Sequence, residues 1–362
     1  MKKKFLCLLF VSCLILSAVS AYAMPVEDIA KISVKADGSD FRYWNDNAPS
    51  LSALKAYIED ITNPSSPNFI PAEDRICVSD MDGTFYGELA PTYAEWYMFF
   101  HRIFDDPAYT PNATEKAFAE ECLKAAKSGK IATDLDAGED HSQSYAFEGM
   151  TLDEFDEYAE NFLRNTSLDG LSNCTFAEAF YLPMVEVIRY LQANGFTFYV
   201  VTGADRQLTR VIMRAIPSVQ PNTVIGSDSN PIAKRQGFSG GLYFQFESED
   251  VMMRGPYMWT NGKMAKVSHI AREIGKRPVM ALGNSSGDGS MMNYARFNPK
   301  YKGFAMGICC DDGERDWGGP DKAAGFRDMC AKYGWTPVSM RDDWKTIYGD
   351  EVKKTEERVF RK

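Results

Sequence analysis

The stretch VSDMDGT, residues 78–84, decides how the rest of the chain is interpreted. The apolar residues around it predict a short buried strand over 75–79, and Asp80 and Asp82 follow that strand one residue apart. Like charges at such short separation raise each other's electrostatic cost. We therefore expect a cation, or a reaction that uses both carboxylates, at the end of this strand.

The composition predicts a folded protein with a sizeable core. The chain has 362 residues, of which 45% are hydrophobic and 13% aromatic, enough for one large or two modest domains. The formal net charge is -10, and no Lys/Arg-rich block follows the first four residues. We therefore expect no nucleic-acid partner. The sequence specifies no oligomeric state.

Residues 1–23 have the pattern of a secretory signal peptide. A basic start at 2–4 precedes an apolar run over 5–19, and Ala21-Tyr22-Ala23 fits a small-x-small cleavage site. The run is shorter than the roughly 20 apolar residues of a membrane span. We expect export to the periplasm or the medium with no membrane attachment after cleavage, and an uncleaved anchor is the alternative.

Six cysteines remain after the predicted signal. Their even number permits up to three disulfides in an exported protein, whereas simple buried thiols are the alternative. The spacing selects no pairing. The six are Cys77, Cys122, Cys174, Cys309, Cys310 and Cys330.

The hydrophobic pattern divides the chain into three further parts. Residues 24–84 contain a predicted helix and the first strand, residues 85–178 have mainly helical spacing, and in residues 179–362 apolar strands alternate with helices. Such alternation is typical of a parallel sheet with helices on both faces. The predicted fold class is therefore α/β. Strands are predicted at 75–79, 196–201, 224–225, 241–246, 278–282 and 303–308, and helices at 50–61, 93–104, 113–126, 152–163, 184–194, 205–215, 263–274 and 289–295.

Polar side chains follow three of the predicted strands. Ligands of open parallel sheets bind beyond the carboxyl ends of the strands, so these side chains converge if the strands are neighbours. The set comprises Asp80 and Asp82 after strand 75–79, Thr202 and Gly203 after strand 196–201, Asn284 and Asp288 after strand 278–282, and Lys263 at the start of a helix.

This set suits the transfer of a phosphoryl group. Several oxygen ligands favour a hard cation, usually Mg²⁺ where phosphate shares the site. A hydroxyl, backbone amides and a lysine suit phosphoryl oxygens. One carboxylate can attack phosphorus, and the other can protonate the leaving oxygen and then activate water.

Four stretches together resemble the ordered motifs of the haloacid dehalogenase superfamily. They are DMDGT at 80–84, VVTG at 200–203, Lys263 and GNSSGD at 283–288. The resemblance covers roughly residues 74–84 and 180–310. It implies a Rossmann-like core, a bound Mg²⁺, and a cap domain inserted between the first two motifs, which here is the helical stretch 85–178.

The resemblance also implies a role for each matching residue. Asp80 corresponds to the nucleophile and Asp82 to the acid/base, and both would bind the metal, Asp82 through its backbone carbonyl. Thr202 corresponds to the hydroxyl that holds a phosphoryl oxygen, Lys263 to the lysine that offsets its charge, and Asp288 to a metal ligand. A carboxyl at Asp82 is typical of the phosphomonoesterases of the superfamily rather than its dehalogenases.

Two positions depart from the pattern or leave it open. The last motif usually begins Gly-Asp, whereas here it is Gly283-Asn284. Asn284 can still coordinate the metal or orient a water, but one negative charge is missing, so we expect weaker metal binding. Lys266 lies one helical turn after Lys263 and is the alternative motif lysine. We favour Lys263 because Asn261-Gly262 places it at the start of the helix.

A finer resemblance concerns the substrate. The stretch YLPMVEVIRYLQANGFTFYVVTGADR, 181–206, resembles phosphoserine phosphatases and their exported relatives, which include phosphocholine phosphatases. In phosphoserine phosphatases a glutamate shortly after the first motif faces the substrate amine, and the resemblance implies this role for Glu88. The alternative is that Glu88 is a solvated residue at the hinge of the cap. Phosphoserine, phosphocholine and nucleoside monophosphates all remain open as substrates.

The aromatic residues that follow the first motif permit two interpretations. They are either helix packing or a box for a quaternary ammonium group. They are Phe85, Tyr86, Tyr93, Trp96, Tyr97, Phe99 and Phe100.

Two functions of other kinds compete with phosphomonoester hydrolysis. One is a non-catalytic protein that binds phosphate or metal, which Asn284 favours. The other is a phosphotransferase that passes the same aspartyl-phosphate to an alcohol.

Overall fold

The computed structural model describes residues 23–127, 141–237 and 241–356. Nearly all of the predicted signal peptide, residues 1–22, lies outside the described residues. Among the described residues, no helix has the length and apolar character needed to span a bilayer. The six cysteines after residue 23 are all buried free thiols in this structure.

The strands form one large sheet and one small sheet. Their bounds are β1 (Ile76–Ser79), β2 (Leu171–Ser172), β3 (Thr197–Asp205), β4 (Val224–Ala233), β5 (Met252–Trp259), β6 (Met280–Gly283), β7 (Phe304–Cys309), β8 (Thr336–Ser339) and β9 (Lys353–Lys354). The large sheet has seven strands in the order β5-β4-β3-β1-β6-β7-β8. All neighbours are parallel except β4 and β5. The predicted α/β class with a mostly parallel sheet is confirmed.

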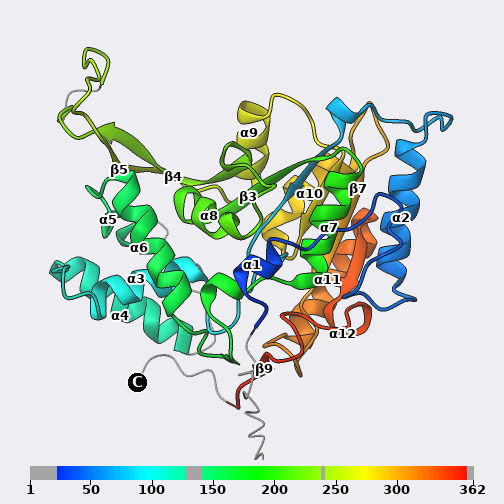
Figure 1. Ribbon diagram of the computed structural model, residues 1–362, viewed down its shortest axis with the longest axis horizontal. Helices are drawn as coiled ribbons and strands as arrows, with labels where there is room; N and C mark the ends of the chain where they lie inside the picture. Colours follow the sequence, from blue (N-terminus) through cyan, green and yellow to red (C-terminus); the bar gives the residue numbers. More distant parts are fainter. Residues whose placement is uncertain (1–22, 128–140, 238–240, 357–362) are drawn as a thin grey trace, which may run out of the picture.

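Helices alternate with the strands along much of the chain (Figure 1). Their bounds are α1 (Val26–Ile29), α2 (Pro49–Thr62), α3 (Ala94–Phe104), α4 (Ala113–Lys127), α5 (Ser142–Tyr145), α6 (Leu152–Asn165), α7 (Leu182–Ala193), α8 (Arg206–Ile212), α9 (Met264–Glu273), α10 (Gly289–Arg296), α11 (Pro320–Tyr333) and α12 (Met340–Asp343).

Two apolar clusters lie on the two faces of the sheet. In β1, Cys77 packs into one cluster, whereas Ile76 and Val78 pack into the other. This alternation follows from the two-residue period of side chains along a strand. Because β1 is buried on both faces, its first three residues are apolar, as is usual for a central parallel strand, and only Ser79 at its end is polar.

Helices α3 to α6 occupy the chain between β1 and β3 and lie together to the left of the sheet (Figure 1). Helix α6 begins with a reciprocal capping pair in which Thr151 and Glu154 each accept the other's backbone N–H, which satisfies two otherwise unpaired donors. The only strand of the described part of 85–178 is β2, and it pairs with β9 near the chain's end. These helices are where the sequence predicts a cap.

Two parts of the fold differ from the sequence prediction. Residues 241–246 form turns and irregular backbone instead of a strand, and the hairpin is built by β4 and the unpredicted β5. Helix α11 and strand β8 also escape the prediction. Only Ala323, Phe326 and Cys330 of α11 are buried, and β8 is four residues long, so the pattern of each is short.

Candidate active site

The site lies where the chain changes direction within the sheet. From β1 the chain continues through β3 and β4 on one side, and later through β6, β7 and β8 on the other. Such a reversal opens a crevice beyond the carboxyl ends of the central strands. The residues after β1 and β6 and at the end of β3 meet at this crevice.

A buried lysine joins two of the predicted aspartates. Lys266 Nζ donates to Asp80 Oδ1 at 2.6 Å and to Asp288 Oδ1 at 2.7 Å. All three residues are buried: Asp80 is 8% exposed, Asp288 1% and Lys266 4%. Helix side chains point toward the helix N-terminus, so Lys266, in the first turn of α9, reaches back to the end of β1.

Lys263 is not the lysine that contacts the aspartates, which corrects the preferred interpretation of the sequence. It is the N-cap of α9 with φ 52° and ψ -123°, and its exposed side chain lies at the wall of the crevice. The unusual backbone at Lys263 rotates its side chain away from the course that helix periodicity predicts. Lys266, the alternative, occupies the predicted position.

The loop after β6 holds Asp288 rigidly. Asp288 Oδ2 accepts the backbone N–H groups of Asn284 and Ser285, both at 3.1 Å, and Ser285 Oγ at 3.3 Å. One oxygen therefore fixes the loop while the other faces Lys266. Gly283 permits this close fold, because a Cβ there would lie 2.6 Å from the Cβ of Asp288.

The turn after β1 brings Asp82 back into the crevice. Gly83 adopts φ 72°, and its N–H donates to the carbonyl of Tyr86 at 2.7 Å. A Cβ at Gly83 would lie 1.8 Å from Asn284 Nδ2 and 2.6 Å from Glu88 Cδ, so only glycine fits between these side chains. Asp82 Oδ1 and Asn284 Nδ2 are both buried without a hydrogen-bond partner in the described structure.

Thr202 lies within β3 and is 1% exposed. Its Oγ1 accepts the backbone N–H of Ala204 at 3.1 Å. Asn261, which the sequence analysis did not assign to the site, supports this strand by donating from Nδ2 to the carbonyl of Thr202 at 2.9 Å. In the sequence, Asn261-Gly262 indicated only the start of the next helix. The contact of Asn261 with Thr202 could not be predicted, because it depends on the distant strand β3.

These residues line one cavity of about 280 Å³. Asp80, Asp82, Thr202, Gly203, Lys263, Asn284 and Asp288, the predicted site residues other than Glu88, contribute to its wall, as does Glu88 itself. The structure therefore brings all eight predicted residues together. Three further wall residues were offered only as alternatives: Tyr93, Trp96 and Lys266. The sequence did not single out the remaining six for the site, which are Glu95, Ala204, Thr260, Gly262, Ser285 and Gly287.

One side of the cavity is formed by the segment that follows the first motif. Glu88 is 3% exposed, accepts the hydroxyl of Tyr93 at 3.3 Å, and lies 3.5 Å from Lys322 Nζ. Of the seven aromatic residues considered above, only Tyr93 and Trp96 line this cavity. Phe85, Tyr86, Phe99 and Phe100 are fully buried in the hydrophobic core, so most of the group is helix packing.

Glu95 links helix α3 to the end of β3. Its Oε2 accepts the backbone N–H of Asp205 at 3.0 Å, and Asp205 Oδ2 in turn accepts from Arg254 of β5 at 2.6 Å. Burial and the neighbouring Asp205 carboxylate raise the pKa of Glu95 to about 8. Such a carboxyl is largely protonated at neutral pH unless a cation enters the cavity.

Burial also raises the pKa values of the two aspartates of the first motif. Desolvation, followed by the charge of Asp288, raises the pKa of Asp80 to about 7, and the Lys266 ammonium opposes this rise. Desolvation, followed by the charge of Asp80, raises the pKa of Asp82 well above its ordinary value. General-acid and nucleophilic roles require one carboxyl that keeps its proton beside another that gives its proton up.

The donor set fits a hard cation, although with few charges. Asp80, Asp288, the Asn284 amide and the Asp82 backbone carbonyl offer the oxygen ligands that Mg²⁺ prefers. Among the described residues, no group of three or more His, Cys, Asp or Glu side chains is placed to hold a metal ion. The Asn284 amide nitrogen has no hydrogen-bond partner in the described structure. A rotation of the amide group by 180° would turn its oxygen toward such an ion instead. The chain itself would therefore supply two carboxylates and one side-chain amide oxygen to such an ion.

No family model and no curated protein matches the chain. Solved structures with a similar fold include a conserved, functionally unknown protein from Anaerococcus prevotii (TM-score 0.45, 13% identity, 80% of this chain and 91% of that chain covered). Another is cytosolic 5'-nucleotidase IIIB bound to cytidine (TM-score 0.44, 14% identity, 88% of this chain and 94% of that chain covered). A third is a phosphoserine phosphohydrolase-like protein from Francisella tularensis (TM-score 0.34, 12% identity, 65% of this chain and 87% of that chain covered). At these TM-scores and identities the likeness concerns the fold alone.

Proposed function

We propose that the protein is a Mg²⁺-dependent phosphomonoester hydrolase of the haloacid dehalogenase type. The observation that carries this proposal is the buried Lys266 ammonium between Asp80 and Asp288, in a cavity that Asp82 and Thr202 also line. A nucleophile, an acid, a hydroxyl and a positive charge at one crevice are the groups that phosphoryl transfer needs.

The reaction has two steps. Asp80 attacks phosphorus while the bond to the leaving oxygen breaks, and Asp82 gives that oxygen its proton, which yields an alcohol and an aspartyl-phosphate. Asp82, now ionised, takes a proton from water as the water attacks phosphorus, so that Asp80 is regenerated and phosphate leaves. Mg²⁺, when bound, would neutralise charge on the phosphoryl oxygens.

The other residues hold the group in place. Thr202 Oγ1 and the backbone at Gly203 would bind phosphoryl oxygens opposite Asp80. Lys266 keeps Asp80 oriented and offsets the charge that collects on the transferring group. Lys263, at the exposed wall of the cavity, would attract the incoming anion. Helix α3 and its neighbours would close over the bound substrate and exclude water, as caps and lids do in many enzymes.

The leaving alcohol faces the side of the cavity where Glu88, Glu95, Tyr93 and Trp96 lie. Carboxylates and aromatic faces together favour a cationic group. We therefore propose a small amine-bearing phosphomonoester, such as phosphoserine or phosphocholine, with Glu88 facing the amine. A nucleoside monophosphate is the second substrate to test, because its neutral sugar would bring no positive charge to the two glutamates.

Export is proposed on the sequence alone, from the basic start, the apolar run and the small-x-small site at 21–23. Expression in a bacterial host followed by fractionation and N-terminal sequencing tests it. Recovery from the periplasm with Met24 as the first residue would support cleavage after Ala23.

Hydrolysis of a chromogenic phosphate ester by the chain beginning at Met24 tests the reaction. The assay compares Mg²⁺ with chelator, and Asp80→Asn with wild type. Asp46→Asn is the matched control, because Asp46 is exposed and pairs only with Lys345 in the described structure. We expect activity to disappear with chelator and in Asp80→Asn, and to persist in Asp46→Asn.

The same assay separates the two competing functions. A folded wild-type protein that binds Mg²⁺ but releases no phosphate would favour the non-catalytic binding protein, for which Asn284 is the supporting residue. Adding acceptor alcohols tests phosphotransfer: a new phosphoester formed at the expense of free phosphate would identify a phosphotransferase.

A further inference from the structure

Behind the wall of the cavity, three polar residues contact the backbone around Thr202 or one another. They are Ser227 of β4, Asn261 in the loop before α9, and His269 of α9. None of the three lines the cavity. Asn261 is 0% exposed and His269 8% exposed. Because burying a polar group is costly unless it is hydrogen-bonded, the contacts of these side chains indicate their role.

Strand β3 leaves its regular pairing with β4 at the segment that would bind phosphate. Val201 is paired with Ile225. The next pair is Asp205 with Ser227, and the register shifts between the two pairs. Residues 202–204 therefore form a bulge. A bulge interrupts the hydrogen bonds between two strands, so the carbonyl groups of this segment need donors from elsewhere.

Side chains supply those donors. Asn261 Nδ2 donates to the carbonyl of Thr202 at 2.9 Å and to that of Ile225 at 3.2 Å, and so bridges the two strands. Ser227 Oγ donates to the carbonyl of Gly203 at 2.5 Å and accepts the backbone N–H of Asn261 at 3.0 Å. Both carbonyl groups of the pair Thr202-Gly203 are therefore held from behind the cavity.

These contacts also fix the groups on the cavity side. A peptide group is planar and trans, so holding its carbonyl sets the direction of its N–H. The Thr202 carbonyl shares a peptide group with the Gly203 N–H, and the Gly203 carbonyl shares one with the Ala204 N–H. The Ala204 N–H donates to Thr202 Oγ1 at 3.1 Å. That hydroxyl therefore keeps its own proton for a ligand.

His269 sets the orientation of the Asn261 amide. Its Nδ1 lies 2.8 Å from Asn261 Oδ1. Because two carbonyl oxygens face the other end of the amide, that end must be its NH₂ group, and Oδ1 must accept a proton from the imidazole. His269 therefore carries its proton on Nδ1. Desolvation and the nearby Arg272 guanidinium lower the pKa of His269, and its ring centre lies 5.1 Å from that of Trp259.

We propose that His269 is a positioning residue for the phosphate-binding segment and acts through the amide of Asn261. The inference rests on the proposed function, because it takes Thr202 and Gly203 as the groups that hold phosphate. Helix α9 then serves the site twice. Lys266 contacts Asp80, and His269, nearly one turn later on the same face, orients the amide that holds the end of β3. Without the imidazole, Asn261 Oδ1 loses its donor and nothing prevents the amide from rotating.

Binding of inorganic phosphate, measured by calorimetry with Mg²⁺ present, tests the proposal whether or not the chain hydrolyses an ester. His269→Leu keeps apolar volume but offers no donor, whereas His269→Asn places an amide N–H close to the position of Nδ1. We expect His269→Leu to weaken phosphate binding about tenfold, which corresponds to the loss of about one hydrogen bond. His269→Asn should stay within about threefold of wild type. A role in packing alone predicts the opposite order, because asparagine removes more apolar volume.

Ser227→Ala is a second and milder test, since Ser227 is only partly buried. It removes the donor to the Gly203 carbonyl and should weaken phosphate binding about threefold. All variants should keep the wild-type circular dichroism spectrum, and binding is measured below their melting temperatures.

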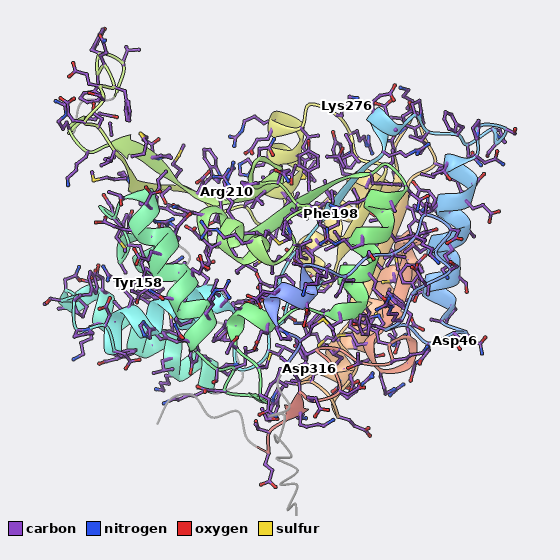
Figure 2. All side chains as sticks on the ribbon, in the orientation of Figure 1. Asp46, Tyr158, Phe198, Arg210, Lys276 and Asp316 are labelled. Carbon is purple, nitrogen blue, oxygen red and sulfur yellow. The ribbon has the colours of Figure 1, made fainter. Side chains whose placement is uncertain are left out.

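His101→Leu is the matched control. His101 Nδ1 is hydrogen-bonded to the Tyr158 hydroxyl at 2.8 Å, and neither residue lines the cavity. Figure 2 shows Tyr158 among the helices to the left of the sheet, away from α9 (Figure 1). The variant loses a buried histidine contact of the same kind, and its phosphate affinity should equal that of wild type.

The imidazole itself gives a readout that does not depend on phosphate. At about pH 8, above the ordinary pKa of histidine, the NMR spectrum of the neutral ring should show the proton of His269 on Nδ1. A proton on Nε2 would overturn the proposal.

The outcomes separate this inference from the proposed function. Wild-type hydrolysis with equal phosphate affinity in wild type and His269→Leu would overturn the inference and leave the hydrolase standing. A larger loss in His269→Asn than in His269→Leu, or a wild type that binds no phosphate, would also overturn it. The expected order of affinities in a chain that hydrolyses no ester would support the inference and refute the hydrolase.

Discussion

Replacing Lys266 by methionine removes one positive charge and little volume from the centre of the site. The ammonium lies 2.6 Å from Asp80 and 2.7 Å from Asp288, and all three groups are buried. Two unit charges 4 Å apart attract by about 4 kcal/mol at an effective dielectric constant of 20. The cost of desolvating the ammonium offsets part of this attraction, so breaking a buried pair costs about 3–5 kcal/mol.

Protonation of Asp80 limits the loss of folding stability in Lys266→Met. The pKa of Asp80 is already raised to about 7 with the lysine present, and it rises further without it, so the variant can neutralise Asp80 at neutral pH. We therefore expect a loss near the lower end, about 3 kcal/mol at pH 7. A raised pKa in the folded state makes stability fall as pH rises, so the loss should be larger at pH 8 than at pH 6.

Urea unfolding followed by tryptophan fluorescence measures this stability loss. The phosphatase rate should also fall, by about 10²–10³-fold, as on removal of one stabilising charge from a transition state. Lys345→Met is the control, because Lys345 lies outside the cavity and its exposed side chain pairs with Asp46 at the surface. Equal losses of activity and stability in the two variants, or none in Lys266→Met, would refute the assignment of Lys266 as the lysine of the site.

Three more predictions follow from other residues of the site. Lys263 has a positive φ of 52°, a strain worth about 1–3 kcal/mol, so Lys263→Gly should raise the free energy of unfolding by about 1 kcal/mol in urea; a decrease would contradict the strain. Glu95 has its pKa raised to about 8, so the folded state binds its proton more tightly and stability is lost as pH rises from about 4.5 to about 8. Because Glu95 is only half-buried beside the cavity, that loss should be about 2 kcal/mol, and Glu95→Gln, which can still accept the Asp205 N–H, should flatten the pH profile of thermal unfolding; an unchanged profile would count against a shifted Glu95. Asn284→Asp restores a third carboxylate and should tighten Mg²⁺ binding about tenfold by calorimetry, while lowering the melting temperature without metal; unaltered affinity would mean that residue 284 does not reach the ion.

The parallel sheet and the position of the site were predictable because they rest on local patterns. Short apolar strands followed at once by polar residues identified the ends of β1 and β6, whereas β3 continues to Asp205, so that Thr202 and Gly203 lie within its last residues. A parallel sheet brings such ends to one edge whatever the loops do. The eight predicted site residues therefore line one cavity although they come from distant parts of the chain.

The assignments that failed depend on contacts between distant segments. Lys263 and Lys266 differ by one helical turn, and the positive φ at Lys263 that decides between them cannot be read from residue order. Glu95 was hidden within an amphipathic helix, since its partner is the backbone N–H of Asp205. The strand predicted at 241–246 does not form: β propensity reflects packing against neighbours, and Leu242 and Tyr243 are 80% and 95% exposed.

The contact between Lys266 and Asp80 joins residues 186 positions apart. As a ribosome makes the chain from its N-terminus, Asp80 and Asp82 emerge long before α9 and the loop at Asp288. During that interval the two carboxylates have neither their cation partner nor the strand β6 whose carbonyl at Leu282 accepts the N–H of Asp80. The centre of the sheet is therefore completed late in synthesis, and a chain truncated before residue 266 lacks both the lysine and Asp288 that complete the site.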